Sequence, residues 1–197
     1  MKELEIIKKS ITSIPKGRPF MASSLASSGS YVNVRQTLSR LVAAGEIMRA
    51  ARGVYVRPNM NPYLGVVLPP SEEIIKILAK QTGEIVTIHG AEAVRQLQLS
   101  TQVPVRPVFN TSGTSRQIKI GKQIVTLKHI SPRKLVQPGT MTCTVISALW
   151  YLGKNNVYET VVNKIKQKLT EQQFAELLKN THKMPRWMSS AFQQYKK

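Results

Sequence analysis

The sequence has few acidic side chains for its size. Ten Asp and Glu residues stand against 29 Lys and Arg residues among 197, so the formal net charge is +19 at pH 7. A surface of that charge attracts polyanions and accelerates their capture, although it says little about the fold. Because residues 1–60 and 131–197 are both strongly basic, a polyanionic partner could contact more than one part of the chain.

Cysteine and long apolar runs are equally scarce. The single cysteine, Cys143, excludes an internal disulfide and a cysteine-rich zinc site. No stretch approaches the roughly 18 apolar residues of a membrane-spanning helix, and the N-terminus lacks the apolar core of a signal peptide. We therefore expect a cytoplasmic protein without a membrane partner, and its 42% of hydrophobic residues is enough for a folded chain.

The residue patterns of common catalytic sites are absent as well. The acidic residues are scattered, and the adjacent pair Glu72 and Glu73 suits the first turn of a helix, where the helix dipole favours negative charge. The histidines lack the spacing of metal ligands, Cys143 lies in an apolar helical run, and no glycine-rich phosphate loop is present. The histidines are His89, His129 and His182. We therefore predict a protein that is not an enzyme, with no metal site and no cofactor.

Hydrophobic spacing over the first sixty residues predicts three helices and a hairpin. Helices are expected over residues 2–13, 21–26 and 31–44, and short strands over residues 46–50 and 54–56. This order is the layout of a winged helix-turn-helix domain, in which the hairpin covers the open side of the helices. The core is expected to contain Leu4, Ile7, Leu25, Val34, Leu38, Leu41, Ile47 and Tyr55.

A proline-rich stretch over residues 58–70 predicts a connection between two domains, because proline at this density continues neither a helix nor a central strand. The domains would cover residues 1–60 and 61–197, and the second would open with a helix capped by Ser71 and ended by Gly83. Further strands are expected over 105–110, 117–120 and 123–128, and further helices over 91–97, 140–152, 157–168, 171–178 and 186–195. The predicted class is α+β, a winged helix-turn-helix followed by a mixed domain of helices and a small antiparallel sheet.

The predicted helix over residues 31–44 has the best candidate surface for binding. At 100° per residue its apolar residues gather on one side, and Asn33, Gln36 and Arg40 fall on the other. Asn and Gln side chains pair with adenine and Arg pairs with guanine, and helix-turn-helix proteins place such a helix in the major groove. Residues that flank this face and could hold phosphates are Ser30, Tyr31 and Arg35.

A cationic hairpin follows this helix and decides between two interpretations of it. A polar helix face is commonly a plain solvated face, but such faces usually mix Glu with Lys, and residues 30–44 contain no acidic side chain. The hairpin carries Arg49, Arg52 and Arg57, and Arg52 lies at its tip, where an arginine can reach a phosphate or a narrow minor groove. Together these features favour binding of double-stranded DNA.

Four strings of the sequence carry a resemblance to known proteins. The string VRQTLSRLVAAGEIMRAARGVYVRP resembles the N-terminal winged helix of AbiEi-type antitoxins, which belong to type IV toxin–antitoxin systems. The later strings LSTQVP, RQIKIGKQIVTLKHISPRKL and ALWYLGK resemble a companion group of AbiEi-like proteins of unknown function. The similarity spans nearly the whole chain. Its C-terminal part is the more distinctive, although that group has no settled chemistry.

The resemblance implies an antitoxin that represses its own promoter and whose companion is a nucleotidyltransferase-like toxin. Residues at matching positions that it implies as DNA contacts are Arg35, Gln36, Arg40, Arg49 and Arg52. The chain departs from the pattern after Pro70, where the region is short and strongly basic. The resemblance therefore supports DNA binding better than it supports neutralisation of a toxin.

Two features of the C-terminal part leave alternatives open. Its basic residues could hold RNA, so an RNA-binding or ribosome-associated protein is the rival interpretation. The C-terminal helix is expected either to pack in the core or to present an aromatic face to a protein partner, including a second copy in a homodimer on an inverted-repeat operator. The stripe in question consists of Trp187, Met188, Ala191, Phe192 and Tyr195.

Overall fold

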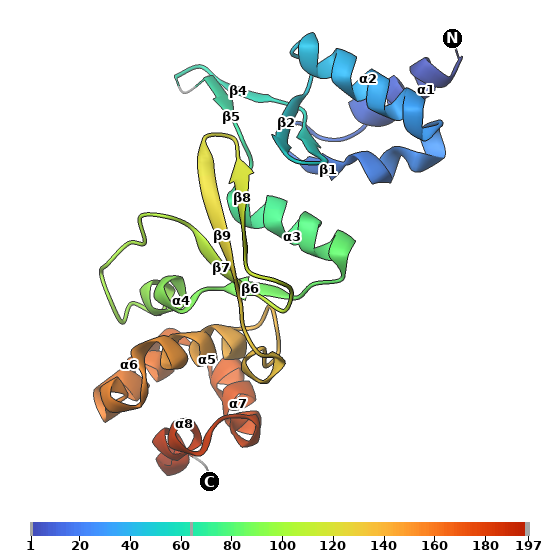
Figure 1. Cartoon of the computed structure of the whole chain (residues 1–197). Coiled ribbons are helices and arrows are strands. Elements are labelled where there is room, and N and C mark those ends of the chain that lie inside the picture. The colour runs from blue at the N-terminus through green and yellow to red at the C-terminus, as the bar shows by residue number, and fades with distance from the viewer. Residues whose placement is uncertain (1, 64, 196–197) are drawn as a thin grey trace. The chain divides into compact units, whose positions relative to one another are not determined.

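The computed structural model describes residues 2–63 and 65–195 of the chain (Figure 1). Helices and small sheets both contribute to it, so the fold is mixed α+β, as the sequence predicts. The chain divides into two compact units, one of residues 1–83 with 118–125 and the other of residues 84–117 with 126–197. Residue 60, where the sequence predicts a boundary between domains, lies within the first unit.

The first unit opens with three helical segments. α1 (Lys2–Thr12) and α2 (Tyr31–Ala43) are α-helices, whereas the segment between them, η1 (Ala22–Ser28), is a 3₁₀ helix. α2 begins after Ser30, because the Ser30 hydroxyl accepts a hydrogen bond from the Asn33 backbone N–H at 3.3 Å. The three predicted helices are therefore confirmed in position, the second of them in the tighter 3₁₀ form.

A three-stranded antiparallel sheet completes the winged helix-turn-helix layout. Its strands, β1 (Pro19–Met21), β2 (Met48–Ala51) and β3 (Val54–Val56), lie in the order β1-β3-β2. The predicted hairpin is the pair β2 and β3. The sequence does not predict β1, in which Phe20 pairs with Tyr55. The helix expected to start at Met21 starts at Ala22, because Met21 still belongs to β1.

The core of the first unit contains the predicted residues with one exception. The prediction is wrong for Leu4, which is 36% exposed, because the buried face of α1 is centred on Ile7 and Ile11 and Leu4 lies at its margin. Tyr55 lies at the edge of the core and is partly buried. The buried members are Ile7, Ile11, Phe20, Leu25, Val34, Leu38, Leu41 and Ile47.

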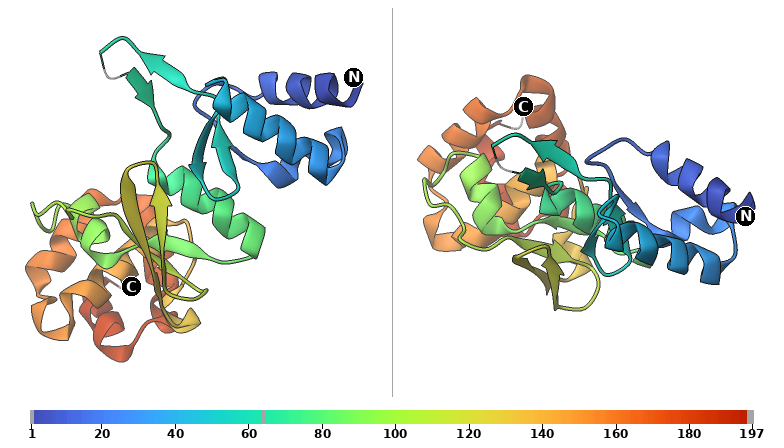
Figure 2. Two further views of the ribbon diagram at one scale, coloured as in Figure 1. Left: turned by 45° about the horizontal axis from the view of Figure 1, so that its top comes forward. Right: turned by 90° about the horizontal axis from the view of Figure 1, so that it is seen from above.

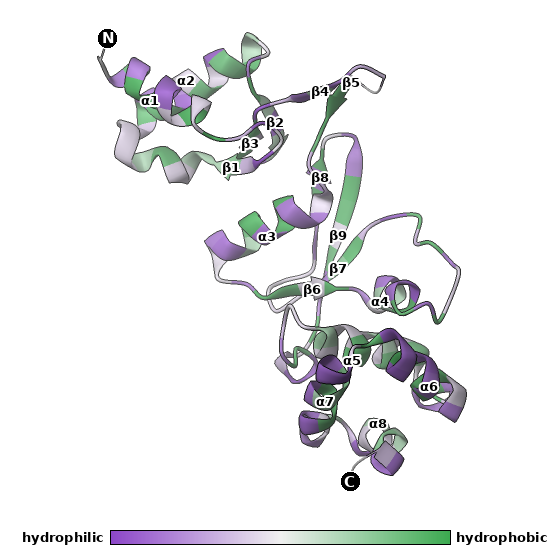
Figure 3. Cartoon of the chain, turned by 180° about the vertical axis from the view of Figure 1, so that it is seen from behind, coloured by the Kyte–Doolittle hydropathy of each residue, from purple (hydrophilic) through white to green (hydrophobic). Residues whose placement is uncertain are grey.

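The proline-rich stretch is more structured than the sequence predicts. β4 (Asn59–Asn61) and β5 (Gly65–Val67) pair antiparallel in it as a short hairpin (Figure 2). α3 (Ser71–Thr82) follows, with hydrophobic and hydrophilic bands along its length (Figure 3), and Gly83 ends it in the left-handed conformation. The predicted N-cap is wrong, because Ser71 is already helical and the proline before it takes the N-cap position.

A four-stranded sheet in the order β6-β7-β9-β8 lies in the middle of the chain. Its strands are β6 (Val86–Ile88), β7 (Val108–Thr111), β8 (Arg116–Ile120) and β9 (Gln123–His129). β6 runs antiparallel to β7, whereas β7 and β9 are parallel. The predicted small sheet is thus confirmed, with one parallel pair and one strand, β6, that the sequence pattern does not reveal.

Helices make up most of the second unit. α4 (Gly90–Gln96) packs against α5 (Met141–Leu152), whose residues 142–149 are all buried. The remaining helices are α6 (Glu159–Lys168), α7 (Glu171–Lys179) and α8 (Arg186–Ala191), and short 3₁₀ turns lie at Pro132–Lys134, Lys154–Asn156, Thr181–Lys183 and Gln193–Tyr195. α5 is central to this unit, since α4, α7 and β6 all contact it.

The aromatic stripe of the C-terminal helix packs in the core of the second unit. Met188 and Phe192 are completely buried, and the Phe192 ring centroid lies 6.4 Å from that of Phe174. Trp187 is partly buried, with its ring centroid 5.9 Å from that of Trp150. Core packing is therefore the correct one of the two interpretations of this stripe.

We expect Leu38→Ala to lower the free energy of unfolding by about 2–5 kcal/mol, because it removes methyl groups from a fully buried site and leaves a cavity. Leu4→Ala deletes the same atoms from an exposed side chain, and we expect a loss below about 1 kcal/mol. Chemical denaturation followed by circular dichroism measures both. Equal losses in the two variants would contradict the placement of Leu4 outside the core.

Candidate nucleic-acid interface

The outward face of α2 is polar and carries no acidic residue. Gln36 and Arg40 are exposed on it, and neither side chain forms a hydrogen bond or an ion pair with any residue that the structure describes. The opposite face is buried in the core, where Thr37 joins the expected apolar residues. Two of the three predicted base-reading side chains are therefore accessible and unengaged.

Glu3 of α1 lies at the N-terminus of α2. Its carboxylate accepts hydrogen bonds from the Ser30 backbone N–H and from the Asn33 side-chain amide, the latter at 2.6 Å. The bond from Ser30 first, and that from Asn33 second, lower the pKa of the Glu3 carboxyl group. Gly29 permits this approach, because a β-carbon there would lie 2.7 Å from a Glu3 carboxylate oxygen. The positive end of the α2 dipole thus already has an anionic partner.

This contact changes the surroundings of two predicted DNA contacts. Ser30 and Asn33 are both exposed, but the Ser30 N–H and the Asn33 amide donate to Glu3, and the Ser30 hydroxyl caps α2. The pattern of α2 gives no signal of this, because the acid comes from a position 27 residues before Ser30. α2 itself contains no acidic residue, but Glu3 of α1 places a carboxylate at its N-terminus.

The three arginines of the hairpin region have different surroundings. Arg49 on β2 and Arg52 in the β2–β3 turn are exposed, with no ion pair to a described residue. Arg57 is half-buried, and its Nη1 donates to the carbonyl oxygens of Thr12 and Ile14, each at 2.6 Å. Those carbonyls lie at and just beyond the end of α1, so Arg57 stabilises the C-terminus of that helix. The sequence pattern does not predict this structural role.

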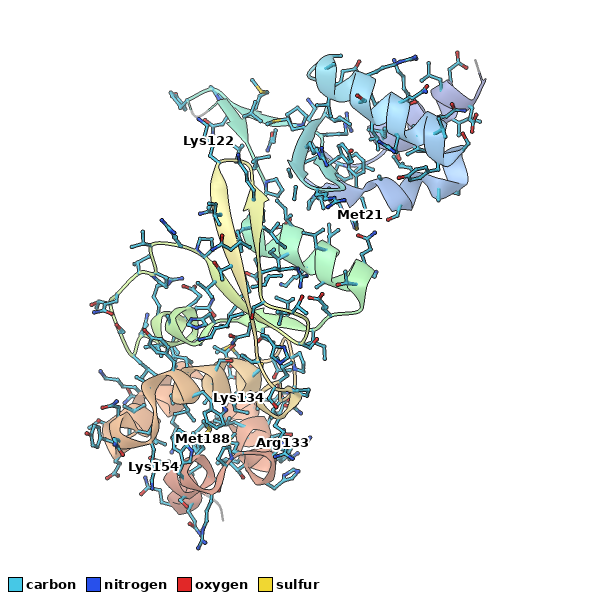
Figure 4. The ribbon with its side chains drawn as sticks, in the orientation of Figure 1. Met21, Lys122, Arg133, Lys134, Lys154 and Met188 are labelled. Atoms are coloured by element: carbon cyan, nitrogen blue, oxygen red, sulfur yellow. The ribbon has the colours of Figure 1, made fainter. Side chains whose placement is uncertain are left out.

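A cavity of about 560 Å³ brings residues of α2 and the hairpin together. Tyr31 and Arg35 line it from α2, and Arg52 lines it from the β2–β3 turn. Met21, labelled in Figure 4, lines it from β1. The Arg35 guanidinium lies 5.7 Å from the centroid of the Tyr31 ring, a cation–π arrangement. Three predicted phosphate contacts from two separate elements therefore line one cavity.

Other kinds of site have little support in residues 2–63 and 65–195. Within these ranges no three His, Cys, Asp or Glu side chains gather as a metal site requires. Nor does any helix there have the length and apolar character needed to cross a bilayer. Cys143 is buried, and burial raises the pKa of its thiol, which disfavours the reactive thiolate. The absence of enzymatic activity stays a prediction.

Comparison with known proteins identifies a family whose function is unknown. The sequence matches a family of unknown function, DUF6088, over residues 6–177. The match covers α2, the β2–β3 hairpin and the elements up to α6. A search for relatives among curated proteins found no match.

We expect Arg57→Ala to lower the free energy of unfolding by about 1–3 kcal/mol, because it leaves the Thr12 and Ile14 carbonyl oxygens without their charged donor. Arg49→Ala removes the same charge from an exposed side chain, and we expect a change within about 0.5 kcal/mol. Denaturation of both variants in parallel measures the difference. The structural role of Arg57 is wrong if the two variants are equally stable.

Proposed function

The chain belongs to DUF6088, a family of unknown function, and we propose that it binds double-stranded DNA as a sequence-specific transcriptional regulator. α2 would enter the major groove, as the recognition helix of helix-turn-helix proteins does. The β2–β3 hairpin would lie along the neighbouring backbone. The first unit alone supplies both elements.

The observation that carries this proposal is the set of unpaired cations on α2 and the hairpin. Arg35 and Arg40 from α2, and Arg49 and Arg52 from the hairpin, are exposed. None of the four forms an ion pair with a carboxylate of the described residues. Like charges repel one another, so a surface that leaves four arginines without counter-charges favours an anionic partner. Release of counterions from the DNA backbone would supply much of the binding free energy.

Gln36 and Arg40 are the side chains best suited to read bases. Their donors are not engaged with the part of the chain that the structure describes, and their two-point hydrogen bonds would select adenine and guanine. Tyr31 and Arg35, near the start of α2, would hold phosphates, as would the exposed arginines of the hairpin. We leave Arg57 out of this set, because the end of α1 already occupies its guanidinium.

Ser30 and Asn33 enter the proposal through Glu3. The N-terminus of a helix favours a phosphate, but the Glu3 carboxylate holds this position on α2. DNA would either approach a resident negative charge or displace it from Asn33, which would free that amide to pair with adenine. In both cases Glu3 opposes binding.

We further propose that the regulator is an autorepressing antitoxin whose companion is a nucleotidyltransferase-like toxin. The support is the resemblance of the sequence to AbiEi-type antitoxins, which extends over nearly the whole chain. Such a repressor would act in the cytoplasm, and an operator with inverted repeats would be bound by a homodimer. A nucleotidyltransferase encoded in the adjacent reading frame would support this role.

On an operator selected from random duplexes, we expect Arg40→Ala to weaken binding of the full-length protein by about 1–3 kcal/mol and to relax the preference at one base pair, because one base contact is lost. Arg52→Ala should weaken binding to all sequences alike and reduce the slope of log K against log salt by about one unit, since one phosphate contact is lost. Fluorescence anisotropy at several salt concentrations measures both effects.

Lys154→Ala is the control for these variants, because it removes one exposed positive charge from the second unit. Its expected effect on operator affinity is small. Equal losses for Arg40→Ala and Lys154→Ala, or unchanged affinity of Arg40→Ala, would contradict the assignment of α2. Either result would instead indicate that a diffuse basic surface, and not α2, attracts the duplex.

We expect Glu3→Gln to strengthen DNA binding about two- to fivefold, because it removes the negative charge at the N-terminus of α2 and keeps a hydrogen-bond acceptor there. Glu5→Gln changes the net charge equally at an exposed position of α1 and is the matched control. Anisotropy titrations compare the two variants with the natural protein. No gain of Glu3→Gln over Glu5→Gln would mean that DNA does not approach this end of α2.

A further inference from the structure

The second unit contains a cavity of about 410 Å³ that the proposed DNA contact does not use. Residues from β7, β9, α5 and the start of α4 line it. Its charged and aromatic lining consists of His89, Lys128, His129, Lys134, Trp150 and Tyr151. None of the described residues that line it is acidic. The volume falls in the range of small-molecule sites, and the charge favours an anion.

The sheet places one of the two lysines beside buried polar residues. Asn110 on β7 lies opposite Lys128 on β9, and Thr87 on β6 lies opposite Asn110. Directly opposed side chains point to the same face of a sheet, so the three residues form one row. Asn110 is 7% exposed, and its amide donates to the Ile88 carbonyl oxygen at 3.0 Å. This hydrogen bond fixes Asn110 in the middle of the row, and Lys128 is exposed at one end of it.

The second lysine is held by an aromatic side chain of α5. The Lys134 Nζ lies 4.3 Å from the centroid of the Trp150 ring, a cation–π contact. Trp150 packs edge-on against Trp187 of the unit's core. The aromatic contact therefore positions the Lys134 ammonium group without neutralising it, and no carboxylate of residues 2–63 and 65–195 forms an ion pair with it.

Two histidines add ring nitrogens to the cavity. His89 Nδ1 accepts a hydrogen bond from the Ala91 N–H at 3.3 Å, so the neutral ring carries its proton on Nε2. Burial first, and the charge of Lys128 second, lower the pKa of His89, which keeps the ring neutral near pH 7. His129 Nδ1 donates to the Gly113 carbonyl oxygen at 2.7 Å. In each ring Nε2 is therefore the nitrogen available to a ligand, since Nδ1 is already engaged.

Tyr151 gives the cavity an exposed aromatic face. Its side chain is 54% exposed, and its ring lies edge-on to His89 with the centroids 5.8 Å apart. Gly90 permits this position, because a β-carbon there would collide with the Tyr151 side chain and lie 2.7 Å from the Ser147 carbonyl oxygen. The close approach of α4 and α5 therefore places the ring at the edge of the cavity.

We propose that this cavity binds a nucleoside monophosphate group, with the phosphate between Lys128 and Lys134 and the base against Tyr151. Two ammonium groups without a carboxylate suit a phosphate dianion, to which charge-assisted hydrogen bonds are strong. A planar base stacks on an exposed aromatic ring, and the His89 Nε2–H is a donor for its polar edge or its sugar. A free nucleotide and the 5′-phosphorylated end of a single strand offer the same group. The site is independent of DNA binding by the first unit.

The chemistry of the lining disfavours other small ligands. Calcium and magnesium require oxygen ligands, carboxylates above all, whereas the charged side chains that line this cavity are basic. A transition metal would suit the histidines, but no three His, Cys, Asp or Glu side chains of the described residues gather as such a site requires. An apolar ligand would bury two ammonium groups without a partner, which costs free energy. A simple inorganic anion would use the lysines but would leave the Tyr151 face unoccupied.

Calorimetric titration of the full-length protein with adenosine 5′-monophosphate, adenosine and inorganic phosphate tests the proposal. Tryptophan fluorescence gives a second readout, because Trp150 lies against Lys134. We expect the nucleotide to bind at least about tenfold more tightly than adenosine or phosphate alone, because both contacts contribute. A short oligoadenylate with and without a 5′-phosphate distinguishes a strand end from a free nucleotide. Tighter binding of either phosphorylated form than of its parts supports the site.

Matched variants locate the binding. We expect Lys128→Gln and Tyr151→Leu each to weaken nucleotide binding about tenfold or more. Lys154→Gln (Lys154 is labelled in Figure 4) and Tyr158→Leu make the same changes at exposed positions of the second unit that do not line the cavity, and we expect them to bind normally. Circular dichroism and thermal unfolding establish that each variant is folded.

Three results would overturn the proposal. One is no binding of adenosine 5′-monophosphate at millimolar concentration by the folded protein. Another is equal affinity for the nucleotide and for inorganic phosphate, which would leave a simple anion site without base recognition. The third is an equal loss in Lys128→Gln and Lys154→Gln, which would mean that the charge of the whole unit, and not this cavity, attracts the nucleotide.

Discussion

The shortage of carboxylates is the constraint on which the rest of this structure depends. Ten acids cannot pair with 29 cations, so most Lys and Arg side chains need another partner or remain in solvent. Arg57 donates to main-chain carbonyls at the end of α1, and Lys134 and Lys166 lie against aromatic rings. Neither solution neutralises the positive charge. The field of the protein therefore stays positive even where its cations are structurally engaged, and the partners it favours are anions.

Because acids are few, the position of each one has a large local effect. Glu84 accepts hydrogen bonds from Thr111 and Arg116 and joins β7 to β8. Glu3 lies at the start of α2, where a helix attracts negative charge. One acid thus strengthens a sheet, while the other occupies a helix N-terminus, a position that would also suit a phosphate. The exposed cations of α2, Arg35 and Arg40, therefore lie beyond the N-terminus that Glu3 occupies.

Local patterns in the sequence predict those structural features that are determined by residues within a few positions of one another. The apolar spacing of α1 and α2 and the turn of the β2–β3 hairpin are of this kind. β1 and β6 are only three residues long and have no such pattern, since their pairing with β3 and β7 depends on distant segments. The same holds for the site. Exposure of Gln36 and Arg40 follows from helix geometry, whereas Glu3 at α2, Arg57 at α1 and the grouping of His89 with Lys128 require the tertiary fold.

Close approaches at two glycines decide which chemical groups the two candidate sites present. At Gly29 the missing side chain admits a carboxylate to the start of α2, which lowers the positive potential there. At Gly90 it admits the Tyr151 side chain between α4 and α5, which adds an aromatic face to a cationic cavity. Both effects come from volume and not from charge on the glycine itself. The composition therefore favours anionic ligands for the whole protein. The packing at these two glycines determines how much positive charge each candidate site presents and which neighbouring group accompanies that charge.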